Sequence, residues 1–84
     1  MNRATSTYRV TVLGGLETLD RMLKRARAQG AVIATSGVTL GAVSVRFRCA
    51  TDEALARDVA RRIAGPLEFT LTTGYGIHEH EIKP

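Results

Sequence analysis

Two amphipathic stretches, each followed by a glycine, constrain what this chain can fold into. Residues 15–29 carry leucines and an alanine at helical spacing, and Gly30 follows them. Residues 52–64 repeat that apolar spacing, and Gly65 follows them. Apolar side chains three or four positions apart form one face of a helix, and a glycine commonly ends it. The spacing therefore predicts two helices, each with one buried side.

Strand-like segments surround both predicted helices. Residues 7–13 alternate apolar and polar side chains, while 31–40 and 42–49 form a hairpin about Gly41. Leu67, Phe69 and Leu71 alternate in the same way and predict a fourth strand. The order β-α-β-β-α-β is typical of a ferredoxin-like α+β sandwich, in which a four-stranded antiparallel sheet carries both helices on one face.

The predicted elements divide the chain into a domain and two ends. We expect residues 1–6 to be a flexible N-terminus and 7–73 to form the domain. Residues 74–84 form either a tail or a short edge strand. Thr51 is expected to cap the second helix, and Gly37 to mark a bulge or bend in the hairpin.

The side of the predicted sheet away from the helices, here called the open face, is polar, partly basic and free of aromatic residues. Arginines alternate with small polar side chains along the first and third strands. The residues expected on it are Arg9, Thr11, Ile33, Thr35, Ser44, Arg46, Arg48, Glu68, Thr70 and Thr72.

Composition limits the class of protein. Eighty-four residues are enough for one domain, and the net charge of +4 favours a nucleic acid, an anionic ligand or an acidic partner unless it reflects genome composition alone. A single cysteine, Cys49, excludes an internal disulfide. No apolar run is long enough to span a membrane, so we expect a cytoplasmic protein without membrane association.

The first predicted helix carries a family resemblance. Residues 17–24 (ETLDRMLK), with Arg27 and Gly30 after them, resemble the first helix of short acetohydroxyacid synthase (acetolactate synthase) small subunits. Those subunits are ACT-type ferredoxin-like domains. The similarity of pattern extends loosely over residues 8–73, through the hairpin, the second helix and the last strand.

The resemblance implies a regulatory subunit without catalytic activity or a cofactor of its own. Such subunits bind a large, thiamine-diphosphate-dependent catalytic subunit, and some respond to valine, leucine or isoleucine. ACT domains generally bind an amino-acid effector at the turn that here contains Gly14, Gly15 and Leu16, although no Asp or Pro precedes these glycines. The turn is either a ligand site or only a turn. In agreement, no catalytic motif stands out in the sequence.

Two other functions are compatible with the sequence. His78 and His80 lie on one side of an extended segment and are weak candidates for a zinc or nickel site. Arg9, Arg46 and Arg48 are candidates for a nucleic-acid surface, although that surface lacks the aromatic residues on which bases stack.

Two further predictions concern the helix surfaces and the sheet edges. On the helices, Glu17 with Arg21 and Asp58 with Arg62 are spaced for ion pairs, and the remaining basic residues are expected to face solvent. Small size and free sheet edges favour a homodimer.

Overall fold

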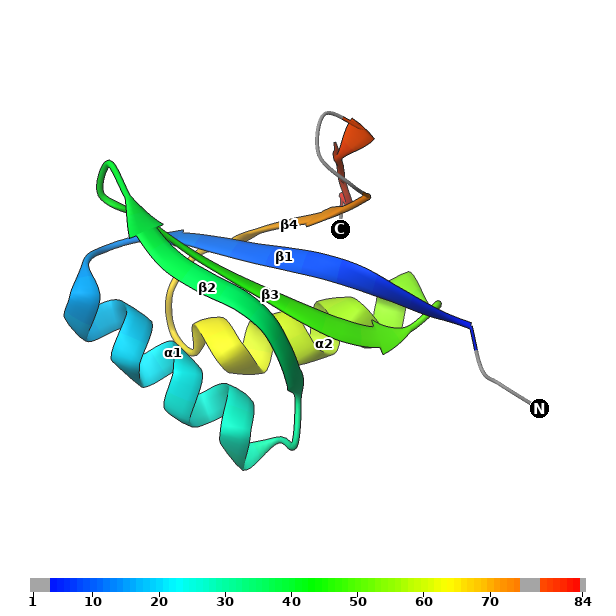
Figure 1. Ribbon diagram of the computed structural model, residues 1–84, viewed down its shortest axis with the longest axis horizontal. Helices are drawn as coiled ribbons and strands as arrows, with labels where there is room; N and C mark the ends of the chain where they lie inside the picture. The colour runs from blue at the N-terminus through cyan, green and yellow to red at the C-terminus, as the bar shows by residue number, and fades with distance from the viewer. Residues whose placement is uncertain (1–3, 75–77, 84) are drawn as a thin grey trace.

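The computed structural model describes residues 4–74 and 78–83, which form two helices and five strands (Figure 1). β1 begins inside the segment that was expected to be a free end. The elements in chain order are β1 (Thr5–Leu13), α1 (Leu16–Ala28), β2 (Val32–Thr39), β3 (Ala42–Ala50), α2 (Glu53–Ala64), β4 (Thr70–Thr73) and β5 (His80–Glu81).

All five strands belong to one antiparallel sheet with the order β2-β3-β1-β4-β5. Both helices pack against the same face, and the C-terminal segment extends the sheet beyond β4 (Figure 1). The chain is therefore a small α+β protein whose layers are compatible with a ferredoxin-like fold. The sheet has five strands and not the predicted four, because the segment expected to be a tail or a short edge strand provides β5, which pairs with β4 through Thr72–Glu81 and Thr73–His80.

The hydrophobic core lies between the sheet and the helices. Alternate residues of β1 and β3 are buried, as the period of two requires, and Met22 and Ile63 of the helices are fully buried over them. The rings of Tyr8 and Phe47 stack with their centroids 5.9 Å apart. Burial raises the pKa of the Tyr8 phenol above its usual value of 10.0, because the charged form loses hydration.

The end of α1 is as predicted, but the residue that caps α2 is not. Gly30 has a φ of 70° directly after α1, as a helix-ending glycine should. Asp52, not Thr51, caps α2: its Oδ1 accepts hydrogen bonds from the backbone N–H groups of Ala54 (2.9 Å) and Leu55 (3.3 Å). The carboxylate lies one residue closer to the helix than the Thr51 hydroxyl and therefore reaches these donors.

Arg25 of α1 ties the two helices together at the end of α2. Its guanidinium donates to the carbonyl oxygens of Ile63 and Ala64, each at 3.4 Å. Gly65 follows with a φ of 66°, and a side-chain carbon there would collide with the Arg25 guanidinium. This arginine is half-buried, so the expectation that it simply faces solvent was wrong.

A bulge in β2 changes which side chains face the helices. The register shifts between Ile33 and Thr35, and no shift occurs at Gly37, where the bulge was expected. Ile33 pairs with Phe47 on the helix side of the sheet and packs against the core, so placing it on the open face was wrong. Thr35 pairs with Arg46 on the open face.

The fourth strand is also shorter than expected. β4 begins at Thr70, and of its predicted inward residues only Leu71 is fully covered, while Leu67 is 40% exposed. Glu68 lies in the preceding loop and is exposed. None of the described helices is both long enough and apolar enough to cross a membrane.

Candidate functional site

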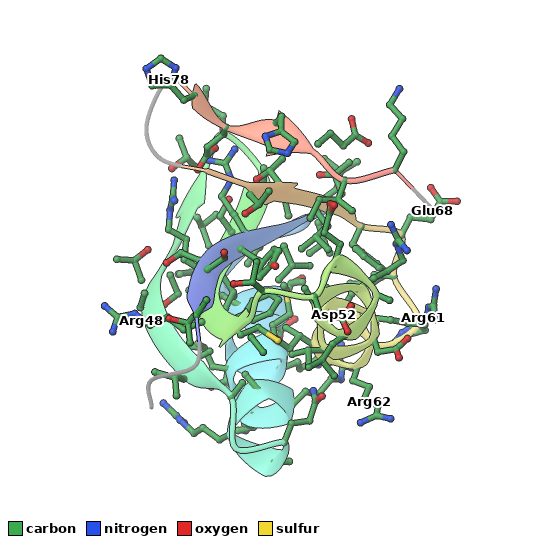
Figure 2. All side chains as sticks on the ribbon, turned by 90° about the vertical axis from the view of Figure 1, so that its right-hand side faces the viewer. Arg48, Asp52, Arg61, Arg62, Glu68 and His78 are labelled. Atoms are coloured by element: carbon green, nitrogen blue, oxygen red, sulfur yellow. The ribbon has the colours of Figure 1, made fainter. Side chains whose placement is uncertain are left out.

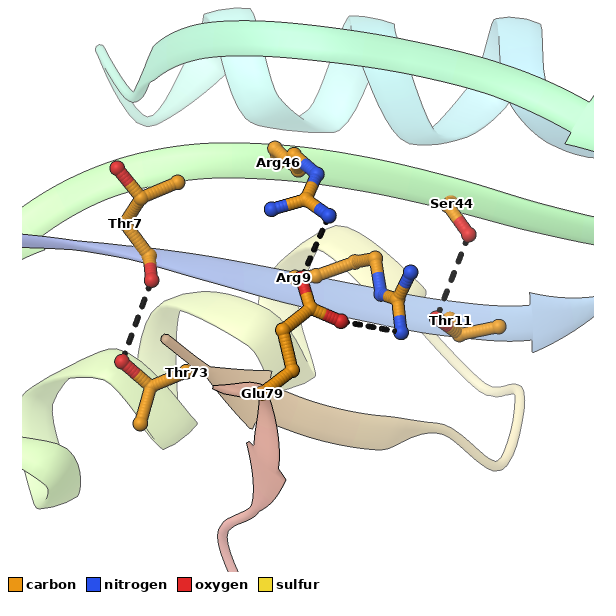
Figure 3. Close-up of polar contacts among 7 residues, drawn as sticks. All are labelled: Thr7, Arg9, Thr11, Ser44, Arg46, Thr73 and Glu79. Atoms are coloured by element: carbon orange, nitrogen blue, oxygen red, sulfur yellow. Dashed lines mark hydrogen bonds and ion pairs between the residues drawn. The ribbon is translucent and has the colours of Figure 1, made fainter. Parts of the chain in front are cut away.

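A carboxylate bridges two arginines at the centre of the open face. Glu79 Oε2 lies 2.7 Å from Arg9 Nη2, and Glu79 Oε1 lies 2.5 Å from Arg46 Nη2 (Figure 3). The Glu79 side chain is only 12% exposed, while Arg9 is 34% and Arg46 29% exposed. Each arginine thus uses one nitrogen on a separate oxygen of one sheltered carboxylate, which is a charge-assisted arrangement.

Strand geometry explains how these three residues meet. Arg9 and Arg46 are directly opposite one another in the β1–β3 ladder, where two like charges repel unless an anion lies between them. Ile82 is buried and its N–H donates to the Leu71 carbonyl at 2.7 Å. With Ile82 facing the helices, the alternation of side chains places Glu81 and Glu79 on the open face.

The cluster leaves two polar atoms unsatisfied. Arg9 Nε and Thr72 Oγ1 are buried and have no hydrogen-bond partner among the described residues. Thr72 is the register partner of Arg9 on β4. A buried polar atom without a partner costs free energy, so Glu79 fills this site incompletely. Nearby, Thr73 Oγ1 donates to the Thr7 carbonyl at 3.2 Å and holds β4 to β1.

The three arginines proposed for nucleic-acid binding do not share one environment. Arg9 and Arg46 are paired with Glu79, whereas Arg48, further along β3, is exposed at the edge of the molecule (Figure 2). Glu79 was not predicted as the partner of these arginines. The spacing of Glu79 and Glu81 indicates only that these two acids share one face of a candidate edge strand, and the face itself depends on the pairing with β4.

The glycine turn between β1 and α1 is joined to the hairpin tip. The Gly14 N–H donates to the Gly41 carbonyl at 2.8 Å, so this donor is already used and does not point at a ligand. A side-chain carbon at Gly14 would collide with Thr18, which explains the glycine on packing grounds. No side chain among the described residues caps α1, so its first N–H groups, from Leu16 on, lack the usual partner there.

Three leucines around this turn form an exposed apolar surface, here called the leucine patch. Leu13 is 84%, Leu16 76% and Leu40 100% exposed. They lie at the end of the sheet where β1 turns into α1 and β2 turns into β3, at the left of Figure 1. A cleft of about 500 Å³ adjoins the patch and is lined by Thr11, Val12, Leu13 and residues 67–70.

Leu40 occupies a backbone position that leucine disfavours. It has a φ of 52° and the next residue, Gly41, a φ of 76°. Two-residue hairpins with positive φ at both positions prefer Asn-Gly, because asparagine tolerates this region better than a branched apolar side chain. A fully exposed leucine here contributes neither to the turn nor to the core.

A second cleft, of about 530 Å³, separates the end of α2 from the C-terminal segment. Leu67, Phe69 and Ile82 line it together with charged residues. Arg57 donates a hydrogen bond to the Lys83 carbonyl across one end of it, so this arginine also departs from the expected solvent-facing role. The contact attaches the end of the C-terminal segment to α2.

The candidate metal ligands do not come together. His78 and His80 are both exposed, and His78 lies at the outer end of the C-terminal segment (Figure 2). Within residues 4–74 and 78–83, no group of three or more His, Cys, Asp or Glu side chains is arranged to hold a metal ion. Cys49 is a partly buried free thiol beside the core.

The helix surfaces carry ion pairs other than the expected ones. Asp20 pairs with Lys24 at 3.0 Å and Asp58 with Arg61 at 3.6 Å, and all four side chains are mostly exposed. The prediction that Asp58 pairs with Arg62 was therefore wrong; Arg62 points outward from α2 (Figure 2). Exposed pairs of this kind contribute little to stability.

Comparison with protein-family models, with curated proteins and with solved structures gave no match.

Proposed function

We propose that this chain is a non-catalytic regulatory or interaction subunit with an ACT-type ferredoxin-like fold. Its first helix resembles that of acetohydroxyacid synthase small subunits, and on this proposal its partner is a large, thiamine-diphosphate-dependent catalytic subunit. The α+β architecture with both helices on one face supports the proposal, because it leaves turns and sheet edges free for contacts.

The observation that carries the proposal is the exposure of Leu40. A left-handed conformation costs a leucine about 1–2 kcal/mol, and full exposure offers no compensation within the chain. Strained residues cluster where a protein binds something. Exposed apolar patches likewise mark protein contacts. We assign the leucine patch to contact with the catalytic subunit.

A small apolar amino acid is the proposed effector, and it binds beside the same turn. The uncapped start of α1 favours a carboxylate, because the helix dipole is positive there. The neighbouring cleft contributes Leu13 and Phe69 as apolar lining for an aliphatic side chain. Gly15 and Leu16 are the turn residues that approach such a ligand, since the N–H of Gly14 is already bonded.

Self-association is proposed through the outer edge of β2. This strand is the edge of the sheet, and its residues 32–39 include no charged side chain and no proline. Such edges pair readily with another strand. The opposite edge is already extended by the short strand β5. A second copy joined at β2 gives one continuous sheet.

Leu40→Asn separates binding from folding. Asparagine suits the positive φ, so we expect the free energy of unfolding to rise by about 1 kcal/mol while capture of the large subunit from the same genome falls. Unfolding is measured in urea and capture by pull-down with purified large subunit. Leu55→Asn, at a partly exposed leucine of α2, is the control and retains capture. Undiminished capture by Leu40→Asn contradicts the assigned interface.

The effector and the dimer are tested on the same purified protein. Valine, leucine or isoleucine is expected to raise the melting temperature, and glycine is the control ligand.

Ala34→Lys places a charge on the β2 edge and is expected to shift the sedimenting species from dimer to monomer. Ala28→Lys, at an exposed position of α1, is the charge-matched control. If the unchanged protein sediments as a monomer at all concentrations, the proposed dimer is contradicted.

The other two functions receive less support from the described residues. Of the three arginines proposed to bind nucleic acid, two already pair with Glu79. Tyr8 and Phe47, on which bases could stack, are buried on the helix side, away from the open face. A metal-responsive role has only two exposed histidines. We therefore do not propose either of them.

A further inference from the structure

We propose that Arg9 and Arg46 form a binding site for a carboxylate on an acidic peptide segment of another protein, and that Glu79 occupies this site in the free chain. The proposal concerns the open face and does not depend on the leucine patch or on the identity of the catalytic subunit. It assigns the C-terminal segment the role of a built-in competitor.

The strands that carry the site do not include Glu79. Arg9 and Arg46 are fixed by the β1–β3 ladder, which pairs them directly, and this ladder includes neither β5 nor the C-terminal segment. Two guanidinium groups held side by side need an anion, since they repel one another at close range. The two oxygens of one carboxylate satisfy both, as Figure 3 shows. A carboxylate therefore fits between the two arginines.

Glu79 is attached in a way that permits exchange. β5 pairs with β4 at only two positions, and the firm anchors of the segment lie beyond it, at buried Ile82 and at the Lys83 carbonyl. Glu79 itself lies just before this two-residue strand and outside the β4–β5 pairing. It also leaves Arg9 Nε and Thr72 Oγ1 without partners. A ligand that reached these atoms as well would be favoured over Glu79.

The chemistry of the occupant indicates a peptide. Glu79 belongs to a segment that runs beside β4 as an added strand, so a peptide that replaced it could pair with the same edge and present its own carboxylate. A nucleic acid would also bring negative charge, but the open face offers no aromatic side chain among the described residues for a base to stack on. The ligand proposed for the arginine site is therefore an acidic peptide.

Two glutamate substitutions test the competitor. Glu79→Gln and Glu81→Gln change the net charge equally, and both side chains face the open side, but only Glu79 pairs with the arginines. The probe is a fluorescein-labelled hexaglutamate peptide, followed by fluorescence anisotropy at two salt concentrations. We expect Glu79→Gln to bind it about tenfold more tightly than wild type, because the fraction of free sites rises, and Glu81→Gln to bind as wild type does.

Two double variants test whether the gain in peptide affinity depends on the paired arginines. Adding Arg46→Gln to Glu79→Gln is expected to abolish the gain, whereas adding Arg48→Gln, at the exposed arginine of the same strand, is expected to leave most of it. Equal binding by Glu79→Gln and Glu81→Gln overturns the proposal, since charge alone would explain it. A gain for a single-stranded RNA oligonucleotide but not for the peptide also overturns it.

A measurement on the unchanged chain covers the case in which Glu79→Gln does not fold. The hexaglutamate peptide is added to millimolar concentration while the arginine Nε–H signals are followed by NMR. Shifts confined to Arg9 and Arg46 support the proposal. Shifts no larger than that of Arg48, or no shift at all, overturn it.

Discussion

On the covered face of the sheet, Val10, Val45 and Phe47 are fully buried beneath the helices, whereas on the open face Arg9 and Arg46 meet a carboxylate from the C-terminal segment. The first arrangement rests on apolar area, which is not directional and tolerates small shifts. The second rests on two ion pairs whose distances must be short. The covered face therefore sets the stability of the fold, and the open face is the one that can change state.

The largest expected effect is on the covered face. Phe47→Ala removes a fully buried ring that stacks on Tyr8, and we expect the free energy of unfolding to fall by about 3–5 kcal/mol. Urea denaturation measures it. Phe69→Ala, at a partly buried ring near the edge, is the control and should lose less. A loss below about 1 kcal/mol for Phe47→Ala would show that the core is not where stability resides.

The next effect compares a sheltered ion pair with an exposed one. A double-mutant cycle with Arg9→Gln and Glu79→Gln is expected to give a coupling free energy of about 1–3 kcal/mol, because Glu79 is 12% exposed. The same cycle with Asp20→Asn and Lys24→Gln should give about 0.3–0.5 kcal/mol, since both side chains are more than half exposed. Equal couplings would remove the distinction between the open face and an ordinary surface.

The smallest effect concerns how a covering helix begins. Asp52→Ala removes the carboxylate that accepts the N–H groups of Ala54 and Leu55, and should lower the free energy of unfolding by about 1 kcal/mol. Thr51→Ala is the matched control and should change it by less than about 0.5 kcal/mol. The reverse order would restore Thr51 as the cap. Thermal denaturation of both variants decides between them.

The covered face was predictable because its cause is local. Alternation in residues 7–13 and 42–49, and helical spacing ending at Gly30 and Gly65, depend only on neighbours along the chain. Ile33 shows the limit: simple alternation places it on the open face with Thr35, but a bulge between the two residues puts Ile33 on the helix side while Thr35 stays on the open face. Nothing in the local composition, not even Gly37, marks that position.

The open face was predictable only in part. Arg9 and Arg46 were expected there, but their partner comes from a segment that the sequence left as either tail or strand. Pairing across such a separation depends on the path of the whole chain, which periodicity does not describe. The leucine patch was missed for a related reason: alternation alone does not reveal that Leu13, Leu16 and Leu40 end at one corner.

The Arg9–Glu79–Arg46 contact joins residues from opposite parts of the chain, which has a consequence for synthesis. Synthesis from the N-terminus makes Arg9 and Arg46 before Glu79. Closing so long a loop is slow compared with forming the hairpin of β2 and β3. Any state in which β1 and β3 are paired while Glu79 is not in place therefore carries an unneutralised basic face, which negatively charged surfaces attract.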